Sequence, residues 1–247
     1  MTLSSALQEI RALPGAHVGR NYGLGNDVVA EEMRRMVSKE VGTEYVQQVA
    51  TRSITSLTEV ELRIRPYQLP QDYRAFLELC GGLVLHKPSE KGLLLDVFGI
   101  GPGTMYWYTD LLEMNRFELP EPFKEPDYSF RAEEPLPRDA PAPRQLYVAA
   151  WHRDLDAAEA AVILSKRPEL LEPLPPGIKV KDYRLHWEVI QFFIDLAGDI
   201  RPHGILAYRE MLQSGGEREY TTVADSFLEW LEMIGQHRGQ LEFLLPE

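Results

Sequence analysis

The chain of 247 residues carries 38 acidic and 26 basic side chains, which gives a formal net charge of −12, and 44% of its residues are hydrophobic. This composition indicates a globular protein with enough chain to bury its own core. The negative charge disfavours a nucleic-acid partner, because phosphates would be repelled at each contact. A basic protein partner agrees with this charge, and so does a charge that serves solubility alone.

The cysteine content and the lengths of the apolar runs indicate in which cellular compartment the protein is expected. A single Cys cannot form an internal disulfide, which agrees with a reducing environment. Residues 1–15 lack the basic start and the uninterrupted apolar core of a secretory signal. No apolar run approaches the roughly 18 residues that a membrane-spanning helix needs. We therefore expect a cytoplasmic protein that does not associate with membranes.

Residues 1–56 are predicted to form a helical N-terminal extension. Ser5 and Gln8 have the spacing of a capping box at the start of a short helix. After a glycine-rich loop, further helical segments are expected to start near Asp27 and near Glu44. The sequence leaves open whether this extension folds by itself.

The stretch from Leu62 to Leu85 predicts a helix, a stop and a strand. Pro70 suits the first turn of the helix, because the amide hydrogen that it lacks would be unpaired there. Gly81 and Gly82 end the helix, since glycine accepts the left-handed conformation that closes it. Four residues at helical spacing form a face that we expect to be buried. They are Tyr73, Phe76, Leu77 and Cys80.

The next predicted elements are a hairpin and a proline-rich segment. The apolar runs at 83–85 and 93–98 are expected to pair across a polar turn, and a short helix is expected within 108–117. From Glu118 to Pro143 the chain contains seven prolines. They exclude a helix or a central strand, so residues 118–143 are predicted to be an extended insertion.

Further strands are predicted at 145–151, 160–164 and 204–208. Residues 187–196 fit neither the helical nor the strand period cleanly, so both interpretations stay open. Near the C-terminus, Ser226 and Glu229 have the spacing of a capping box. The apolar stripe of the helix that they begin consists of Phe227, Trp230, Leu231 and Ile234.

Together these elements predict an α+β fold. Its centre is a mostly antiparallel sheet of about five strands, flanked by helices at both ends, with Pro-rich insertions in the connections. The main domain is assigned to residues 57–237, and residues 238–247 are assigned to a C-terminal tail.

Two segments resemble the signature of the SMI1/KNR4 (SUKH) superfamily. Residues 69–82, LPQDYRAFLELCGG, have the family's Leu-Pro, Tyr, Phe-Leu and Gly-Gly, with Cys80 in place of its frequent Asn. Residues 223–231, VADSFLEWL, are similar to the family's C-terminal helix. The resemblance spans residues 57–235 with a diverged middle. The matching positions are Leu69, Pro70, Tyr73, Phe76, Leu77, Gly81, Gly82, Ser226, Phe227, Trp230 and Leu231.

This resemblance implies a sheet flanked by helices and a function without catalysis. Bacterial members of the family are often immunity proteins, which neutralise toxins, many of them nucleases, by direct binding. The resemblance thus implies a protein partner, namely a basic toxin domain, while eukaryotic relatives imply a scaffold in signalling or cell-wall regulation. A purely structural subunit is a third interpretation, and the oligomeric state stays open.

The residues that carry most enzyme and metal chemistry are sparse. Cys80 lies on the stripe that we expect to be buried, which argues against a nucleophile. The six His residues show no metal-binding spacing, and one Cys excludes a CxxC pair. Asp154, Asp156 and Glu159 fit a solvated turn with a helix cap. We therefore expect no catalytic, cofactor-binding or metal-binding residues.

The alternative from another class is a small-molecule or nucleotide-binding enzyme that uses the glycine loops near Gly23 or Gly101. The loop near Gly101 is interrupted by Pro102 and followed by Tyr-Trp-Tyr, so it departs from the dinucleotide fingerprint, in which the glycines open a helix. The loop near Gly23 precedes a helix but lacks the Gly-Lys-Ser/Thr of a phosphate loop.

The segment with Tyr106, Trp107 and Tyr108 is the predicted partner-binding site. Three consecutive aromatic residues cannot all face one core, so we expect at least one to be exposed. Exposed aromatic residues beside Asp96 and Asp110 have the composition of a binding hot spot. Packing of two of the three in the core is the competing interpretation.

Overall fold

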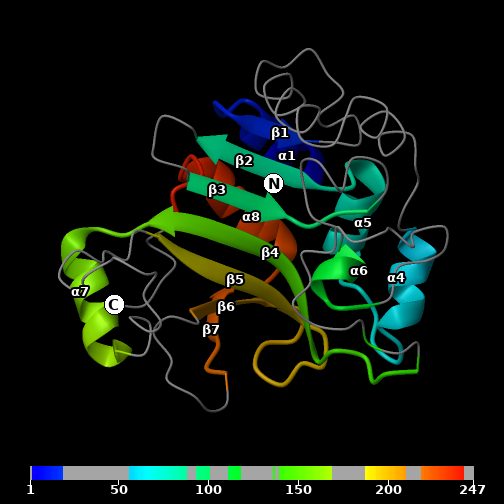
Figure 1. The fold of residues 1–247 in the computed structure, drawn as a ribbon. Helices are drawn as coiled ribbons and strands as arrows, with labels where there is room; N and C mark the ends of the chain where they lie inside the picture. Colours follow the sequence, from blue (N-terminus) through cyan, green and yellow to red (C-terminus); the bar gives the residue numbers. More distant parts are fainter. Residues whose placement is uncertain are drawn as a thin grey trace, which may run out of the picture.

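An antiparallel sheet of seven strands, ordered β1 to β7 as in the sequence, forms the centre of the fold (Figure 1). The computed structural model describes residues 2–18, 56–87, 93–100, 111–117, 136, 139–168, 187–209 and 218–241. The strands are β1 (Ala16–Val18), β2 (Leu83–Lys87), β3 (Leu93–Val97), β4 (Gln145–Asp154), β5 (Trp187–Asp195), β6 (Ile205–Arg209) and β7 (Thr221–Ala224). The α+β prediction is therefore confirmed, with two more strands than expected.

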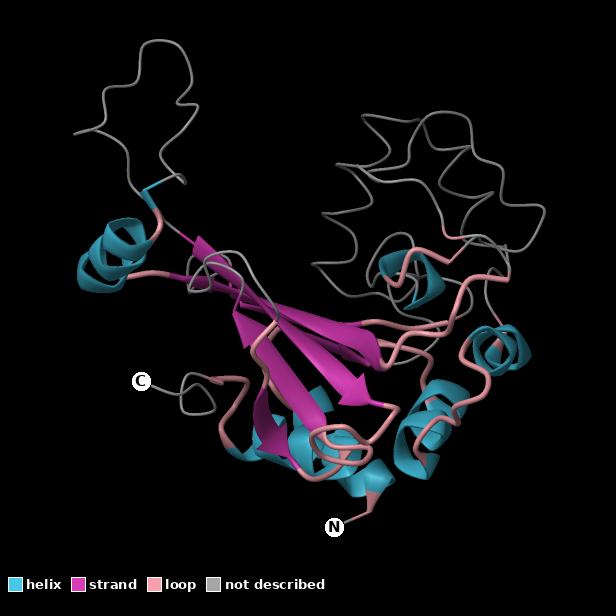
Figure 2. Ribbon diagram, turned by 90° about the horizontal axis from the view of Figure 1, so that it is seen from below, coloured by secondary structure: helices cyan, strands magenta, loops and turns pink. Residues whose placement is uncertain are grey.

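The helices are distributed unevenly around this sheet. They are α1 (Leu3–Arg11), α4 (Leu57–Arg63), α5 (Gln71–Leu79), α6 (Leu111–Met114), α7 (Ala157–Lys166) and α8 (Phe227–Gln236). Figure 2 shows α1, α5 and α8 on one face of the sheet, while α7 lies beyond one end of the strands. No helix within the described ranges is long and apolar enough to cross a membrane.

The predicted helix, stop and strand at residues 62–85 is confirmed in its main features. Pro70 is the N-cap, one position earlier than expected, and Asp72 lies in the first turn of α5. Tyr73, Phe76 and Leu77 are fully buried. Gly81 has φ +80°, the left-handed conformation that ends the helix and lets the chain turn into β2.

Helices α5 and α8 pack directly on each other. The ring of Phe227 lies 4.7 Å from Tyr73 and 5.0 Å from Phe76, measured between centroids. The Leu228 N–H donates to Oδ2 of Asp72 at 2.8 Å. The Ser226 hydroxyl accepts from the Glu229 N–H, so the first turn of α8 is capped by Ser226, its N-cap, and by a carboxylate from α5. The two segments that resemble the SUKH signature therefore share one core.

The N-terminal residues belong to the same body as the sheet. Strand β1 pairs with β2, and Ala6, Leu7 and Ile10 of α1 are buried in the core next to α8. The expected boundary at residue 56 therefore does not separate residues 2–18 from the main domain. The helix cap also differs from the prediction, because Thr2 is the N-cap and Ser5 is the third helical residue of the capping box.

The structure assigns the secondary structure of two segments in the second half of the chain that the sequence predicted wrongly or left open. Residues 160–164 were expected as a strand, but they lie inside α7, which the capping box of Asp156 and Glu159 begins. Residues 187–195 are a strand. Its apolar run lacks a period because apolar side chains lie on both faces: Phe192 contacts Trp230 of α8, and Phe193 stacks on Tyr147 on the other side.

Several predictions concern residues outside the described ranges. They include most of the N-terminal extension (19–55), most of the Pro-rich insertion (118–135 and 137–138) and most of the C-terminal tail (242–247).

Candidate protein-binding surface

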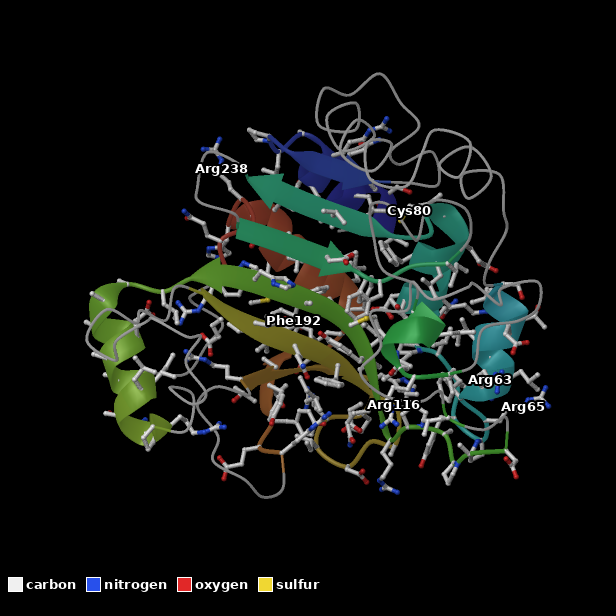
Figure 3. All side chains as sticks on the ribbon, viewed as in Figure 1. Arg63, Arg65, Cys80, Arg116, Phe192 and Arg238 are labelled. Atoms are coloured by element: carbon white, nitrogen blue, oxygen red, sulfur yellow. The ribbon has the colours of Figure 1, made fainter. Side chains whose placement is uncertain are left out.

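The two faces of the sheet carry different side chains. Phe192, labelled in Figure 3, packs on Trp230 of α8. Successive residues of a strand point to opposite faces, so its neighbour Phe193 lies on the other side. We call the side of Phe193, opposite α1, α5 and α8, the open face. No helix of the described ranges covers the middle of this face in Figure 2.

An unbroken series of aromatic rings crosses the open face, and we call it the aromatic strip. It consists of Phe98, Tyr147, Phe193, Tyr220 and Tyr208. Centroid distances between successive rings in this order are 4.7, 4.9, 5.4 and 5.9 Å. These separations lie in the range of favourable aromatic pairs, so each ring is positioned by its neighbours.

The rings of the strip differ in exposure. Phe98 and Phe193 are 1% and 4% exposed and form its floor, whereas Tyr147, Tyr208 and Tyr220 are half-buried. A half-buried Tyr offers an apolar ring and a hydroxyl while its side chain stays ordered. This is the residue type that dominates hot spots of protein interfaces.

Arg218 covers one end of the strip. Its guanidinium carbon lies 5.2 Å from the centroid of Tyr208 and 5.8 Å from that of Phe193, within cation–π distance of both rings. Arg218 is exposed to solvent. The strip thus combines Tyr with Arg, the two residue types that join Trp as the most frequent binding anchors.

Next to the strip, the loop between β5 and β6 is built around one carboxylate. Asp195 is fully buried and accepts hydrogen bonds from the amides of Gly198, Asp199, Ile200 and Arg201, at 2.7 to 3.2 Å. The hydrogen bond from Arg144 lowers the pKa of Asp199. Because so many of its amides are satisfied internally, the loop presents Ile200, which is 47% exposed, in a fixed position.

The predicted partner-binding residues are only partly within the described ranges. Asp96 lies on the open face, in the cross-strand row that runs through Ala150 and Gln191 to Tyr208. It is 9% exposed, so it is buried rather than an exposed anchor. Tyr106, Trp107, Tyr108 and Asp110 lie outside the described residues, and their role stays a prediction.

The signature residues serve the core and not the open face. Tyr73, Phe76, Leu77, Phe227, Trp230 and Leu231 are fully buried, and Leu69 is 8% exposed. Pro70 and Ser226 are helix caps, and Gly81 and Gly82 form the buried turn into β2. These positions therefore pack the core, and none of them belongs to the aromatic strip.

In the described part of the chain, Cys80 and Glu188, which could serve as a nucleophile and as an acid, are buried and bound to other protein groups. Cys80 (Figure 3) is 4% exposed, and its thiol donates to the carbonyl oxygen of Phe76 at 3.4 Å. Glu188 is fully buried and binds Arg153 and Arg209 at 3.0 Å. Among the described residues, no group of His, Cys, Asp or Glu could hold a metal ion.

His152 is a titratable residue on the open face. Its cross-strand neighbours are Leu94 of β3 and Val189 of β5. Burial lowers its pKa below the ordinary value of 6.5, because the charged imidazolium is disfavoured in an apolar environment.

A cavity of about 710 Å³ lies between α4 and α5, and none of its lining residues belongs to the aromatic strip. Its lining includes Glu61, Arg65, Tyr67 and Arg74. Arg74 is held by Glu61 and Glu78, at 2.8 and 2.7 Å. Gly23 and Gly101, which the enzyme alternative would use, lie outside the described residues.

We compared the chain with models of protein families, with curated proteins and with solved structures, and none of these comparisons finds a match.

Proposed function

We propose that the chain is a protein-binding module without catalytic activity, similar to the bacterial immunity proteins of the SUKH superfamily. In this proposal it neutralises a basic toxin domain, such as a nuclease, by direct binding. The proposal places the chain in the cytoplasm, where its single Cys would stay reduced.

The observation that supports the proposal best is the difference between the two faces of the sheet. Both SUKH-like segments lie on the face of the sheet that α1, α5 and α8 cover, where Phe227 joins Tyr73 and Phe76 in one core. The open face instead carries ordered, half-buried tyrosines with an exposed Arg beside them. Ordered aromatic side chains lose little conformational entropy on binding, so this face is suited to hold a protein partner.

The charge of the chain agrees with a basic partner. A net charge of −12 attracts a cationic domain and accelerates its encounter with the acidic chain. The dissociation rate would then depend on the half-buried tyrosines in the central contact. Rapid association combined with slow release is what neutralisation of a toxin requires.

A binding and protection experiment tests this function. The toxin domain encoded beside the gene is titrated with the purified chain, and cells that produce the toxin are assayed for survival. We expect saturable binding and survival that depends on the chain. Replacement of Tyr208 and Tyr220 together by Ala should weaken both readouts. Leu79→Ala, a change at a side chain that is 56% exposed on α5, should weaken neither. Absence of binding and of protection would contradict the proposal.

One observation favours a second candidate, a small-molecule or nucleotide-binding enzyme. The cavity between α4 and α5 has a volume within the range of ligand pockets, and Arg65 is among its lining residues. A nucleotide at 100 times its dissociation constant would stabilise the chain by about 2.7 kcal/mol. Thermal unfolding in the presence of a nucleotide panel would show this as a higher Tm, whereas an unchanged Tm would remove the candidate.

A further inference from the structure

We infer that Arg218 recognises a carboxylate of the protein partner, which makes it a specificity-determining residue of the open face. The inference rests on the proposed function, because it assigns a chemical preference to the same surface. It also goes beyond that function, since a basic partner would be expected to meet acidic side chains and not an Arg.

The first step is that Arg218 is positioned before any partner arrives. Its guanidinium lies over Tyr208 of β6 and Phe193 of β5, at 5.2 and 5.8 Å. Two residues later, Tyr220 contacts the same two rings, at 5.9 and 5.4 Å. Two side chains of this segment, Arg218 and Tyr220, therefore contact the same two rings and fix its position. A side chain that is ordered in advance loses less entropy on binding.

The second step is that the hydrogen-bond donors of Arg218 are not used by another charged group. Within the described ranges, Arg218 forms no ion pair, whereas Arg153 and Arg209 bind Glu188 and Arg201 binds Asp225. The contacts of Arg218 are with aromatic rings, which do not accept the strong hydrogen bonds that a carboxylate accepts. Five donors on an exposed group are therefore left for a ligand.

The third step is the chemistry of the ligand. A guanidinium donates two parallel hydrogen bonds to a carboxylate, and the planar fork distinguishes this acceptor from a single oxygen. The tyrosine rings beside Arg218 exclude part of the water, which strengthens the charge-assisted bonds. An Asp or Glu next to an apolar side chain fits this arrangement, with the apolar group on the ring of Tyr208 or Tyr220.

The overall charge favours a carboxylate in a protein over a polyanion. At physiological ionic strength charges are screened over about 8 Å, so a single contact depends on the groups around it. A polyanion would be repelled by the net charge of −12. A basic domain that contains one acidic residue brings a single negative charge, together with many positive charges that the acidic chain attracts. The expected partner is therefore basic overall and acidic at this contact.

Two titrations of the whole chain test the inference. In the first, the Nε–Hε NMR signal of Arg218 is followed as N-acetyl-Phe-Glu-amide, N-acetyl-Phe-Gln-amide or inorganic phosphate is added. We expect a saturable shift with the Glu peptide and a much smaller one with the other two. An equal response to the Gln peptide would overturn the carboxylate assignment, and so would an equal response to phosphate, which would indicate a general anion site.

In the second titration, variants bind the toxin domain encoded beside the gene. Arg218→Gln and Arg218→Lys should each weaken binding at least about tenfold, because Lys keeps the charge but loses the planar fork. Arg11→Gln is the matched control, since Arg11 is an exposed residue in the last turn of α1, on the other side of the sheet, and the affinity of this variant should be unchanged. Far-ultraviolet circular dichroism would confirm that each variant is folded.

The outcomes separate the inference from the function on which it rests. If the unchanged chain binds the toxin and Arg218→Gln binds within about twofold of it, the inference fails and the proposed function stands. If the unchanged chain does not bind the toxin, the proposed function fails, and the peptide titration alone decides whether Arg218 recognises a carboxylate.

Discussion

Replacement of Phe227 by Ala tests whether α5 and α8 form one core. Phe227 is fully buried and contacts Tyr73, Phe76 and Trp230, at 4.7, 5.0 and 5.7 Å between ring centroids. Truncation of a buried Phe costs about 3 to 5 kcal/mol, because apolar contacts are lost and a cavity remains. Because three ring contacts are lost, we expect a loss in the middle of this range, about 4 kcal/mol.

Urea unfolding measures this loss. With an m value near 3 kcal/mol/M, the upper end for small proteins, a loss of about 4 kcal/mol lowers the midpoint by more than about 1 M. Phe227→Leu keeps most of the volume and should cost about 1.5 kcal/mol. Leu79→Ala, at a residue of α5 that is 56% exposed, should change stability by less than about 0.5 kcal/mol. A loss below about 1 kcal/mol for Phe227→Ala would refute the packing of α8 on α5.

Three further changes have expected results. Asp72→Ala leaves the Leu228 amide without its acceptor, and urea unfolding should show a loss of about 1.5 to 3 kcal/mol. Glu188→Gln removes the buried charge between two Arg side chains and should cost about 3 kcal/mol by the same assay, with a loss below about 1 kcal/mol as the contrary result. The pKa of His152 is lowered in the folded chain. As the pH falls below about 6.5, His152 therefore binds a proton in the unfolded chain before it does so in the folded chain, and the folded chain loses stability. Between about pH 7.5 and 5.5, His152→Gln should therefore lose less stability than the unchanged chain, and identical losses would contradict this.

The helical part of the fold could be predicted because its signals are local. Apolar residues at a spacing of three and four, with Pro70 before one helix and Ser226 before the other, identified α5 and α8. The same rules failed at residues 160–164, where a short run of apolar residues resembles a strand. The cap at Asp156, which begins α7, was the signal that favoured a helix.

The sheet was predicted less well because its strands depend on their neighbours. Strands β1 and β7 have three and four residues, too few to show a period, and pairing with β2 and β6 defines them. Strand β5 carries apolar side chains on both faces, so its apolar run shows no alternation.

The aromatic strip had no sequence signal at all. Phe98, Tyr147, Phe193, Tyr208 and Tyr220 come from five separate positions along the chain, and only the register of the strands brings them together. A cluster of consecutive aromatic residues, such as the one at 106–108, is visible in a sequence. A cluster assembled across strands becomes visible only when the pairing is known.

Hydroxyl-radical footprinting of the chain with the toxin domain that we propose as its partner tests most directly the proposal that the open face binds it. Oxidation of Tyr147, Tyr208 and Tyr220 should slow markedly in the complex, since their half-buried rings would be covered. Oxidation of Leu62 and Leu79, which are 51% and 56% exposed on α4 and α5, should continue at the rate of the free chain. Protection of these two Leu residues with unchanged oxidation of the three Tyr residues would contradict the account.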